Sequence, residues 1–277
     1  MKGPTTDREL LEALREQRDK DPGLSPVIDL HIEIAAARSE IEVQPVGAVP
    51  GQKEIGTLLD ERVPILRRHE LGWDLQAFTA LAARVCDIGA RERPELAPHF
   101  EEVRGLLLGN PVHTRDIVTR YLTHGKVDML AGPDETQELL SFVLIHSLHP
   151  FMHAYAVVLT PNMKDELWYQ RSCPVCGGEP DFGYLEKTVG GLRLLCSRCD
   201  TEWTYRRGEC TFCGNSSKET FAYYIGDDEV YRLYLCGNCK RYLKVLDGRQ
   251  ISFEPLLPLQ RIITVGMDVS AREEGYR

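Results

Sequence analysis

Eight of the nine cysteines lie between residues 173 and 239, and each of the eight belongs to a Cys-x-x-Cys pair. A two-residue spacer lets one tight turn aim both sulfurs at a single ion, and a glycine after the second cysteine permits the backbone conformation that completes the turn. Two such pairs supply the four ligands of one tetrahedral site, so four pairs predict two thiolate metal sites. The pairs are Cys173 and Cys176, Cys196 and Cys199, Cys210 and Cys213, and Cys236 and Cys239.

The lengths of the segments between the pairs favour sequential grouping. Nineteen residues separate Cys176 from Cys196 and 22 separate Cys213 from Cys236, which is enough for a β-hairpin that returns to the metal, whereas ten separate the second pair from the third. Zinc ribbons have gaps of similar length. Sequential grouping is therefore favoured over nested or cross-braced grouping. The first site then holds Cys173, Cys176, Cys196 and Cys199, and the second holds Cys210, Cys213, Cys236 and Cys239.

The chemical context favours metal over disulfides. The first seven residues lack the apolar stretch of a secretory signal, so we expect a cytoplasmic protein, in whose reducing compartment disulfides are uncommon. One Cys-x-x-Cys pair alone can be a redox dithiol. Four pairs among strands too short to form a core of their own indicate folding supported by metal. Four thiolates suit zinc and iron equally well, so the identity of the metal stays open.

The chain up to about residue 165 has the pattern of an all-α domain. Thr6 or Asp7 is a suitable N-cap for a helix over 8–17, and Ser25-Pro26 opens a helix over 27–40. Apolar residues recur at helical spacing over 73–90, and prolines at 94, 111 and 133 introduce further helices. Cys86, beside the apolar stripe of 73–90, is expected to be a buried core residue rather than a reactive thiol.

After Trp168 the pattern changes to short β segments punctuated by glycine. Strands are predicted over 191–195, 202–206, 220–225, 230–235 and 242–246, with Gly226-Asp227-Asp228 as a hairpin turn, and a helical pattern returns from Leu256. The expected fold is a multidomain α+β chain. It comprises a helical domain (1–165), two tandem rubredoxin-like or zinc-ribbon β modules (166–250) and a C-terminal helix packing back (251–277).

Charge and composition exclude several classes of function. The formal net charge is −9, and residues 166–250 carry 12 basic and 12 acidic side chains, which argues against nucleic-acid binding. The chain contains no glycine-rich phosphate loop, nucleophile elbow or telling carboxylate pair, so we do not expect an enzyme. The longest apolar stretch, 139–159, is interrupted by histidines and Pro150, so membrane insertion is not expected.

Three histidines lie in that apolar stretch at spacings of three and four. An unbroken helix would place His146, His149 and His153 on one side, where imidazoles can bind a metal. Pro150 weakens this interpretation because a proline often ends one helix and begins another. A partner-facing or partly buried polar stripe is the favoured role.

The four cysteine motifs, with the residues next to them, are Cys173-Pro-Val-Cys176-Gly-Gly, Cys196-Ser-Arg-Cys199-Asp-Thr-Glu-Trp203, Cys210-Thr-Phe-Cys213-Gly and Cys236-Gly-Asn-Cys239. They resemble the motifs of the formate dehydrogenase accessory protein family, FdhE. The second is the most specific, and the resemblance extends from about residue 140 to the C-terminal Tyr276-Arg277. It implies a cytoplasmic maturation factor, chaperone-like and non-catalytic, that binds the catalytic subunit of a formate dehydrogenase. It also implies iron in rubredoxin-like sites.

Two other functions remain open at this stage. An iron–thiolate centre can exchange one electron, so a rubredoxin-like redox protein is one alternative. A zinc-ribbon protein that stacks bases on Trp203, Tyr205, Tyr223 and Tyr224 is the other, although aromatic residues also suit pleated hairpins. The sequence predicts neither the oligomeric state nor which client is bound.

Overall fold

The computed structural model describes residues 3–45, 49–69, 72–125, 134–164, 168–188, 191–226 and 229–277. Contacts divide the chain into two compact units, which are described separately below. The helical unit comprises Thr6–Ala48 and Leu71–Tyr155, and the sheet unit comprises Met1–Thr5, Val49–Glu70 and Ala156–Arg277. The functional domain limits expected from the sequence (1–165, 166–250 and 251–277) stay a prediction.

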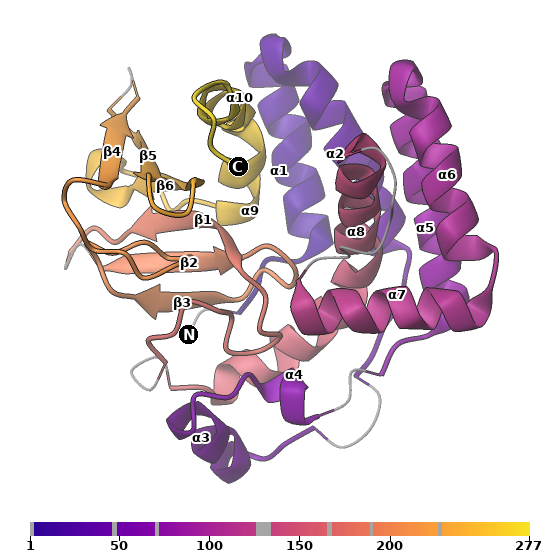
Figure 1. Cartoon of the computed structure of the whole chain (residues 1–277), viewed down its shortest axis with the longest axis horizontal. Coiled ribbons are helices and arrows are strands. Elements are labelled where there is room, and N and C mark those ends of the chain that lie inside the picture. Colours follow the sequence, from indigo (N-terminus) through magenta and orange to yellow (C-terminus); the bar gives the residue numbers. More distant parts are fainter. Residues whose placement is uncertain are drawn as a thin grey trace. The chain divides into compact units, whose positions relative to one another are not determined.

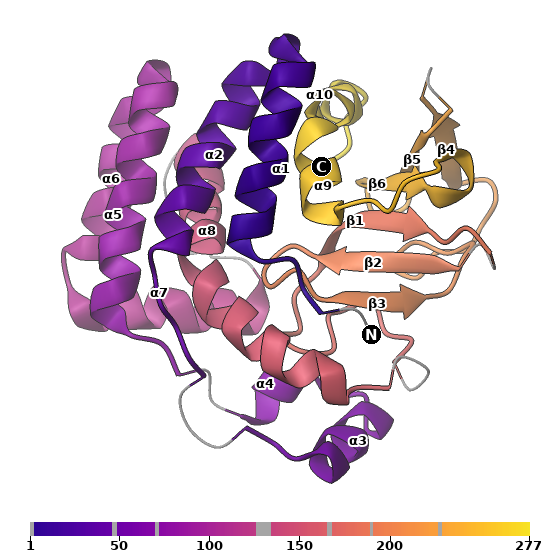
Figure 2. The same ribbon diagram turned by 180° about the vertical axis from the view of Figure 1, so that it is seen from behind.

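The helical unit is built from helices that pack pairwise in chain order. Figure 2 shows α1 beside α2 and α5 beside α6, in agreement with their contacts. The predicted helices are present, with boundaries moved by a few residues. They are α1 (Asp7–Lys20), α2 (Ser25–Ser39), α5 (Leu75–Glu92), α6 (Ala97–Leu108), α7 (Pro111–His124) and α8 (Asp134–Leu159), whose last turn belongs to the sheet unit.

Local sequence explains where these helices begin and how two of them meet. Thr6 caps α1 in a reciprocal capping box with Glu9, as its position before the helix predicted. Cys86 is buried on α5, and burial raises the pKa of its thiol to about 12, so it is an inert core residue. Gly89 lies against the ring of Phe100 on α6, where a Cβ atom would come within 2.2 Å of the ring.

Helix α8 corrects one expectation, because it continues through Pro150 instead of ending there. Proline removes one backbone hydrogen bond, and the burial of the apolar helix outweighs that loss. Residues 135–162 are long and apolar enough to span a membrane, but 61% of their most apolar window is buried in the protein. Such burial is typical of a core helix.

The described strands of the sheet unit form one six-stranded mixed sheet with strand order β3-β2-β1-β6-β5-β4 (Figure 1). β1, β2 and β3 form one antiparallel meander, and β4, β5 and β6 form a second. The parallel pair β1–β6 joins the two meanders into one sheet. The strands are β1 (Pro180–Leu185), β2 (Leu192–Cys196), β3 (Glu202–Tyr205), β4 (Phe221–Ile225), β5 (Tyr231–Cys236) and β6 (Arg241–Asp247).

Four further α-helices lie in the described part of the sheet unit. The predicted C-terminal helix is split at Thr264 into α9 (Leu257–Ile263) and α10 (Val265–Glu273). Leu257 packs with Phe182 and Leu246, and Ala271 packs with Leu233 and Leu235, so both helices bury apolar strand residues. The other two helices, α3 (Gln52–Asp60) and α4 (Ile65–Arg68), were not individually predicted.

The α+β class, with a helical region followed by two four-cysteine β modules and C-terminal helices, is confirmed. Five of the six strands lie at the predicted positions, and β1 was missed. Residues 227 and 228 of the predicted hairpin turn, and Pro133, lie outside the described residues.

Candidate metal centres

Cluster 1 consists of Cys173, Cys176, Cys196 and Cys199, all four of which are buried. The Sγ atoms of Cys173 and Cys199 lie 3.6 Å apart, and those of Cys176 and Cys196 lie 3.4 Å apart. A tetrahedron of sulfurs around one ion, with metal–sulfur bonds of about 2.3 Å, has edges of about 3.8 Å. The observed separations are close to that value, so the four sulfurs fit a single tetrahedral ion.

Cluster 2 consists of Cys210, Cys213, Cys236 and Cys239. Its sulfurs lie 3.7 Å apart in both the Cys210–Cys239 and the Cys213–Cys236 pair. Cys213 and Cys239 are partly exposed, whereas Cys210 and Cys236 are buried. The structure therefore gathers the eight sulfurs into the two sequential groups, and the nested and cross-braced groupings do not occur.

Each cluster is built from the same two turns. In the first turn a glycine after the second cysteine has positive φ, namely Gly177 at 72° and Gly214 at 75°. The backbone N–H of each glycine donates to the carbonyl of the first cysteine, Cys173 or Cys210, at 2.9 Å. The first turn therefore has the same backbone conformation and the same hydrogen bond in both clusters. One antiparallel meander follows each of these turns.

Backbone N–H groups are aimed at sulfur in both clusters. In cluster 1 the N–H groups of Gly178 and Arg198 donate to the sulfurs of Cys176 and Cys196, each at 3.4 Å. In cluster 2 the N–H of Phe212 donates to Cys210 at 3.4 Å. Such donors stabilise thiolates, as metal ligation requires.

The electrostatics of cluster 1 also point to a cation. Burial raises the pKa of Cys173 and the pKa of Cys199 well above the ordinary value, while hydrogen bonds from neighbouring thiols lower the pKa of Cys176. Burial and the closeness of the four sulfurs both disfavour the charged thiolate form, so without a cation the group holds few negative charges. A divalent ion would allow all four thiols to ionise.

Cluster 1 is covered by segments from distant parts of the chain. The backbone N–H groups of Ile65 and Leu66 on α4 donate to the carbonyls of Pro174 and Val175, between the first two cysteines, both at 2.9 Å. These two bonds hold α4 against the turn between Cys173 and Cys176. The sequence contains no signal for this contact.

Charged side chains from α9 and from the segment around Cys196 and Cys199 lie next to cluster 1. Arg261 contacts Asp200 at 3.1 Å and Asp181 at 3.3 Å. Its Nη1 also donates to the carbonyl of Cys196 at 3.5 Å. Arg198, one of several cations that the sequence places near the cysteines, is buried at 4% exposure.

Two tryptophans fix the segment that leads into cluster 1. The indole N–H of Trp168 donates to the carbonyl of Ser172 at 2.8 Å, and that of Trp203 donates to Gln170 at 2.9 Å. Both rings are buried. Trp203 therefore holds the segment that leads into Cys173 in place, in keeping with the packing role expected for it.

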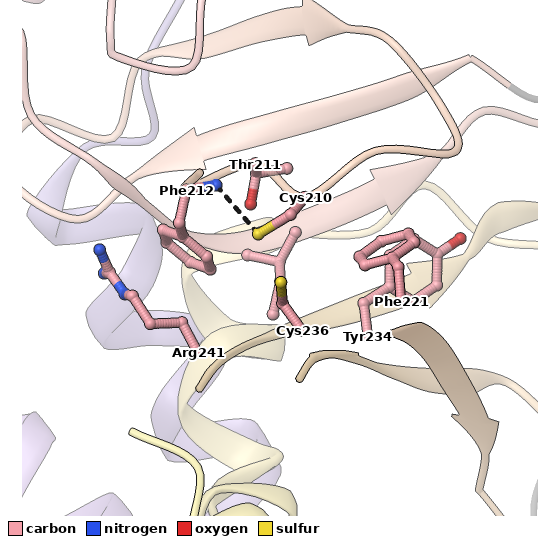
Figure 3. A pocket seen from close by; sticks show the side chains of 8 residues that line it. Cys210, Thr211, Phe212, Phe221, Tyr234, Cys236 and Arg241 are labelled. Carbon is pink, nitrogen blue, oxygen red and sulfur yellow. Dashed lines mark hydrogen bonds between the residues drawn. The ribbon is translucent and has the colours of Figure 1, made fainter. Parts of the chain in front are cut away.

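Cluster 2 borders a small cavity of ≈ 10 Å³, which has room for about one water molecule. In Figure 3 the guanidinium of Arg241 lies beside the ring of Phe212, at 3.7 Å from the ring centre. Phe221 and Tyr234 line the other side of the cavity. Amide groups of Asn238 and Asn215 donate to the sulfurs of Cys213 and Cys236 at 3.6 and 3.9 Å.

The three histidines lie on α8 without converging on a metal site. His149 stacks on His153 with ring centres 5.1 Å apart, and its Nδ1 lies 3.9 Å from Asp7. His146 packs edge-on against Phe142 and contacts Arg38 at 3.5 Å. Within the described ranges, the two cysteine clusters are the groups of three or more metal-binding side chains close enough to share one ion.

Comparisons with known proteins agree with this arrangement. A family profile described as "FdhE, central domain" matches residues 172–207, which carry cluster 1 and the first meander. The protein FdhE homolog of Aquifex aeolicus is 25% identical over 259 residues, which cover 91% of this chain and 83% of that protein. The protein FdhE homolog of Haemophilus ducreyi is 29% identical over 121 residues, which cover 43% of this chain and 39% of that protein.

A solved structure has the same fold. The crystal structure of the FdhE protein from Pseudomonas aeruginosa superposes with a TM-score of 0.56 and 21% identity, over 98% of this chain and 91% of that one. The profile match falls on cluster 1, and the Aquifex relative extends the similarity over both clusters and the helices. The resemblance noted in the cysteine motifs is thereby confirmed: the chain is similar to FdhE proteins in its central segment and, at lower identity, over most of its length.

Proposed function

We propose that this protein is a cytoplasmic accessory factor that binds the catalytic subunit of a formate dehydrogenase and assists its maturation, without catalysing a reaction itself. The observation that carries the proposal is the pair of four-sulfur clusters in a chain that is similar to FdhE proteins. Both the accessory role and the client are carried over from the family.

In this proposal, each cluster holds one thiolate-bound metal ion, iron or zinc. The ligands are Cys173, Cys176, Cys196 and Cys199 in cluster 1, and Cys210, Cys213, Cys236 and Cys239 in cluster 2. The sulfur spacing and the N–H groups aimed at the sulfurs support this assignment. The ions are primarily structural, because they fix the turns from which both meanders start.

Two surfaces in the described residues suit binding of another protein. The helical unit carries an open groove of ≈ 680 Å³, lined by residues of α5, the end of α6 and the start of α7, with Arg115 over the ring of Trp73. In the sheet unit, edge strand β4 exposes Tyr223, Tyr224 and Ile225. Exposed aromatic and arginine side chains are enriched at protein interfaces.

The test is a binding measurement between the full-length, metal-loaded protein and an immobilised formate dehydrogenase catalytic subunit, prepared without oxygen. We expect saturable binding that is lost in the Cys173→Ser/Cys196→Ser variant. The matched control is Cys86→Ala, which alters a buried cysteine outside both clusters and should bind as the unmodified protein does. Absence of binding by folded, metal-loaded protein would overturn the proposed function.

A second candidate, a one-electron iron–thiolate centre, is favoured by one observation: Cys213 and Cys239 in cluster 2 are partly exposed. Electron transfer to a partner requires such access to the metal site. The discriminating measurement is the visible spectrum of protein purified without oxygen. A red protein that bleaches on reduction supports the redox role, whereas a colourless zinc protein that fully supports client activity excludes it.

A further inference from the structure

The two clusters share their turns but differ in how they are covered. All four cysteines of cluster 1 are buried. In cluster 2 the second cysteine of each pair, Cys213 and Cys239, is partly exposed. Because the turns are equivalent, this difference comes from what packs on them.

The coverings can be compared position by position. In cluster 1 the carbonyl of Val175 accepts a hydrogen bond from the backbone of Leu66, within α4. At the equivalent position of cluster 2, the carbonyl of Phe212 accepts one from the side chain of Arg171, which is exposed to solvent. A packed helix therefore takes part in covering cluster 1, whereas a solvated arginine occupies that place in cluster 2.

The second turns differ in the same way. Arg198, between the cysteines of the second pair in cluster 1, is 4% exposed, and its side chain lies beside Gly178. Its counterpart in cluster 2, Asn238, is exposed and donates to the sulfur of Cys213. The residue at this position is therefore buried in cluster 1 and exposed in cluster 2.

We propose that cluster 2 is an exchangeable site, which accepts and releases a soft metal ion through thiol ligands, while cluster 1 remains closed. The entering ligand is a thiol, either a small one or a cysteine of another protein. This inference rests on metal binding, as in the proposed function, and adds a difference in role between the two sites.

The exchange step is a ligand substitution without change of oxidation state. The sulfur of the entering thiol forms a bond to the metal as the bond between the metal and Cys239 breaks. The proton of the entering thiol moves to the departing Cys239 thiolate, so no oxidant or reductant is consumed. Repetition at Cys213, and then at the buried pair, transfers the ion.

The experiment uses the full chain loaded with zinc, and the metal content is measured first. A colorimetric zinc chelator is then added with an excess of a small thiol. We expect two phases of equal amplitude, with the first about tenfold faster, corresponding to a difference of about 1.4 kcal/mol in activation free energy. A single phase releasing both ions would overturn the inference, whereas absence of bound metal would overturn the metal sites of the proposed function.

Mass spectrometry assigns the phases. A brief pulse of N-ethylmaleimide after the first phase should label the four cysteines of cluster 2 and spare those of cluster 1. Labelling of Cys173 or Cys199 in the first phase would contradict the inference.

A pair of variants tests the cover of cluster 1. Leu66→Pro removes the N–H that donates to Val175, at a first-turn position of α4 where proline is tolerated. Leu66→Ala keeps that N–H and is the matched control. We expect the slow phase to accelerate several-fold more in Leu66→Pro than in Leu66→Ala. Equal slow phases in the two variants would overturn the role assigned to α4.

Discussion

Asp200 and Lys240 occupy equivalent positions, each directly after the last cysteine of its cluster, and both have positive φ, at 55° and 57°. L-residues adopt this left-handed conformation at a cost of about 1–2 kcal/mol. The two positions differ in their side chains, because Asp200 is buried and contacts Arg261, whereas Lys240 is exposed and lies over the ring of Tyr276. The same backbone requirement is thus met in two different environments.

Substitution of glycine for Lys240 and for Asp200 should change the free energy of unfolding in opposite directions. We expect Lys240→Gly to raise the free energy of unfolding by up to about 1 kcal/mol, because strain is relieved and an exposed contact is lost. Asp200→Gly should lower it, because Arg261 loses a buried partner. Denaturant unfolding of metal-saturated protein measures both, and stabilisation by Asp200→Gly would contradict the role given to its ion pair.

Metal removal should unfold the sheet unit selectively. Trp168 and Trp203 are buried in that unit, whereas Trp73 lies in the helical unit. Because structural thiolate sites contribute about 10–16 kcal/mol of apparent folding free energy, chelation should expose the two buried indoles. We expect a red shift of tryptophan fluorescence with most of the helical circular dichroism retained. An unchanged emission spectrum in demonstrably metal-free protein would argue against structural ions.

Gly89 should be sensitive to the addition of a single methyl group. A Cβ atom there would lie 2.2 Å from the ring of Phe100, so Gly89→Ala should lower the free energy of unfolding by about 1–3 kcal/mol. The matched control is Gly105→Ala on α6, where an added Cβ would meet no atom within 4 Å apart from its chain neighbours and its own helix backbone, so alanine should stabilise by about 0.5–1 kcal/mol. Thermal unfolding of both variants measures the contrast, and equal shifts would contradict the close packing of α5 on α6.

Asp247 joins two arginines at the end of β6. Its carboxylate is fully buried and accepts hydrogen bonds from Arg249 and Arg232, which lower its pKa to about 2. Asp247→Ala should lower the free energy of unfolding by roughly 3 kcal/mol at neutral pH, because Arg232 loses its buried partner.

The pH dependence of this contribution follows from the lowered pKa of Asp247. The folded pKa lies below the unfolded value of about 3.9, so the stabilisation is complete above that pH and is lost as the pH falls toward 2. The stability difference between the unmodified protein and Asp247→Asn should therefore shrink over this range. A difference that grows on acidification would contradict the assignment.

Local patterns made much of the fold and site predictable. The spacing of the cysteine pairs indicated both groups of sulfurs, since a two-residue turn is a local structure. The cap at Thr6 and the periodicity of α5 likewise indicated helices. These features depend on residues close together in sequence.

The parts that were missed depend on distant contacts. Strand β1 contains Gly183, which lowered its apparent β propensity, yet glycine fits there because a Cβ would lie 3.2 Å from Val245 on the parallel partner β6. The cover that α4 places on cluster 1 consists of backbone hydrogen bonds, which leave no trace in side-chain patterns. Helix α8 continues through Pro150 because burial of its apolar side chains outweighs the preference of proline to end a helix.

X-ray absorption at the metal edge, on full-length protein purified without oxygen and quantified against protein concentration, tests the two metal centres most directly. The predicted result is two ions per chain, each with four sulfur neighbours at about 2.3 Å. Folded protein with no bound ion, or ions with mainly oxygen and nitrogen neighbours, would contradict the account.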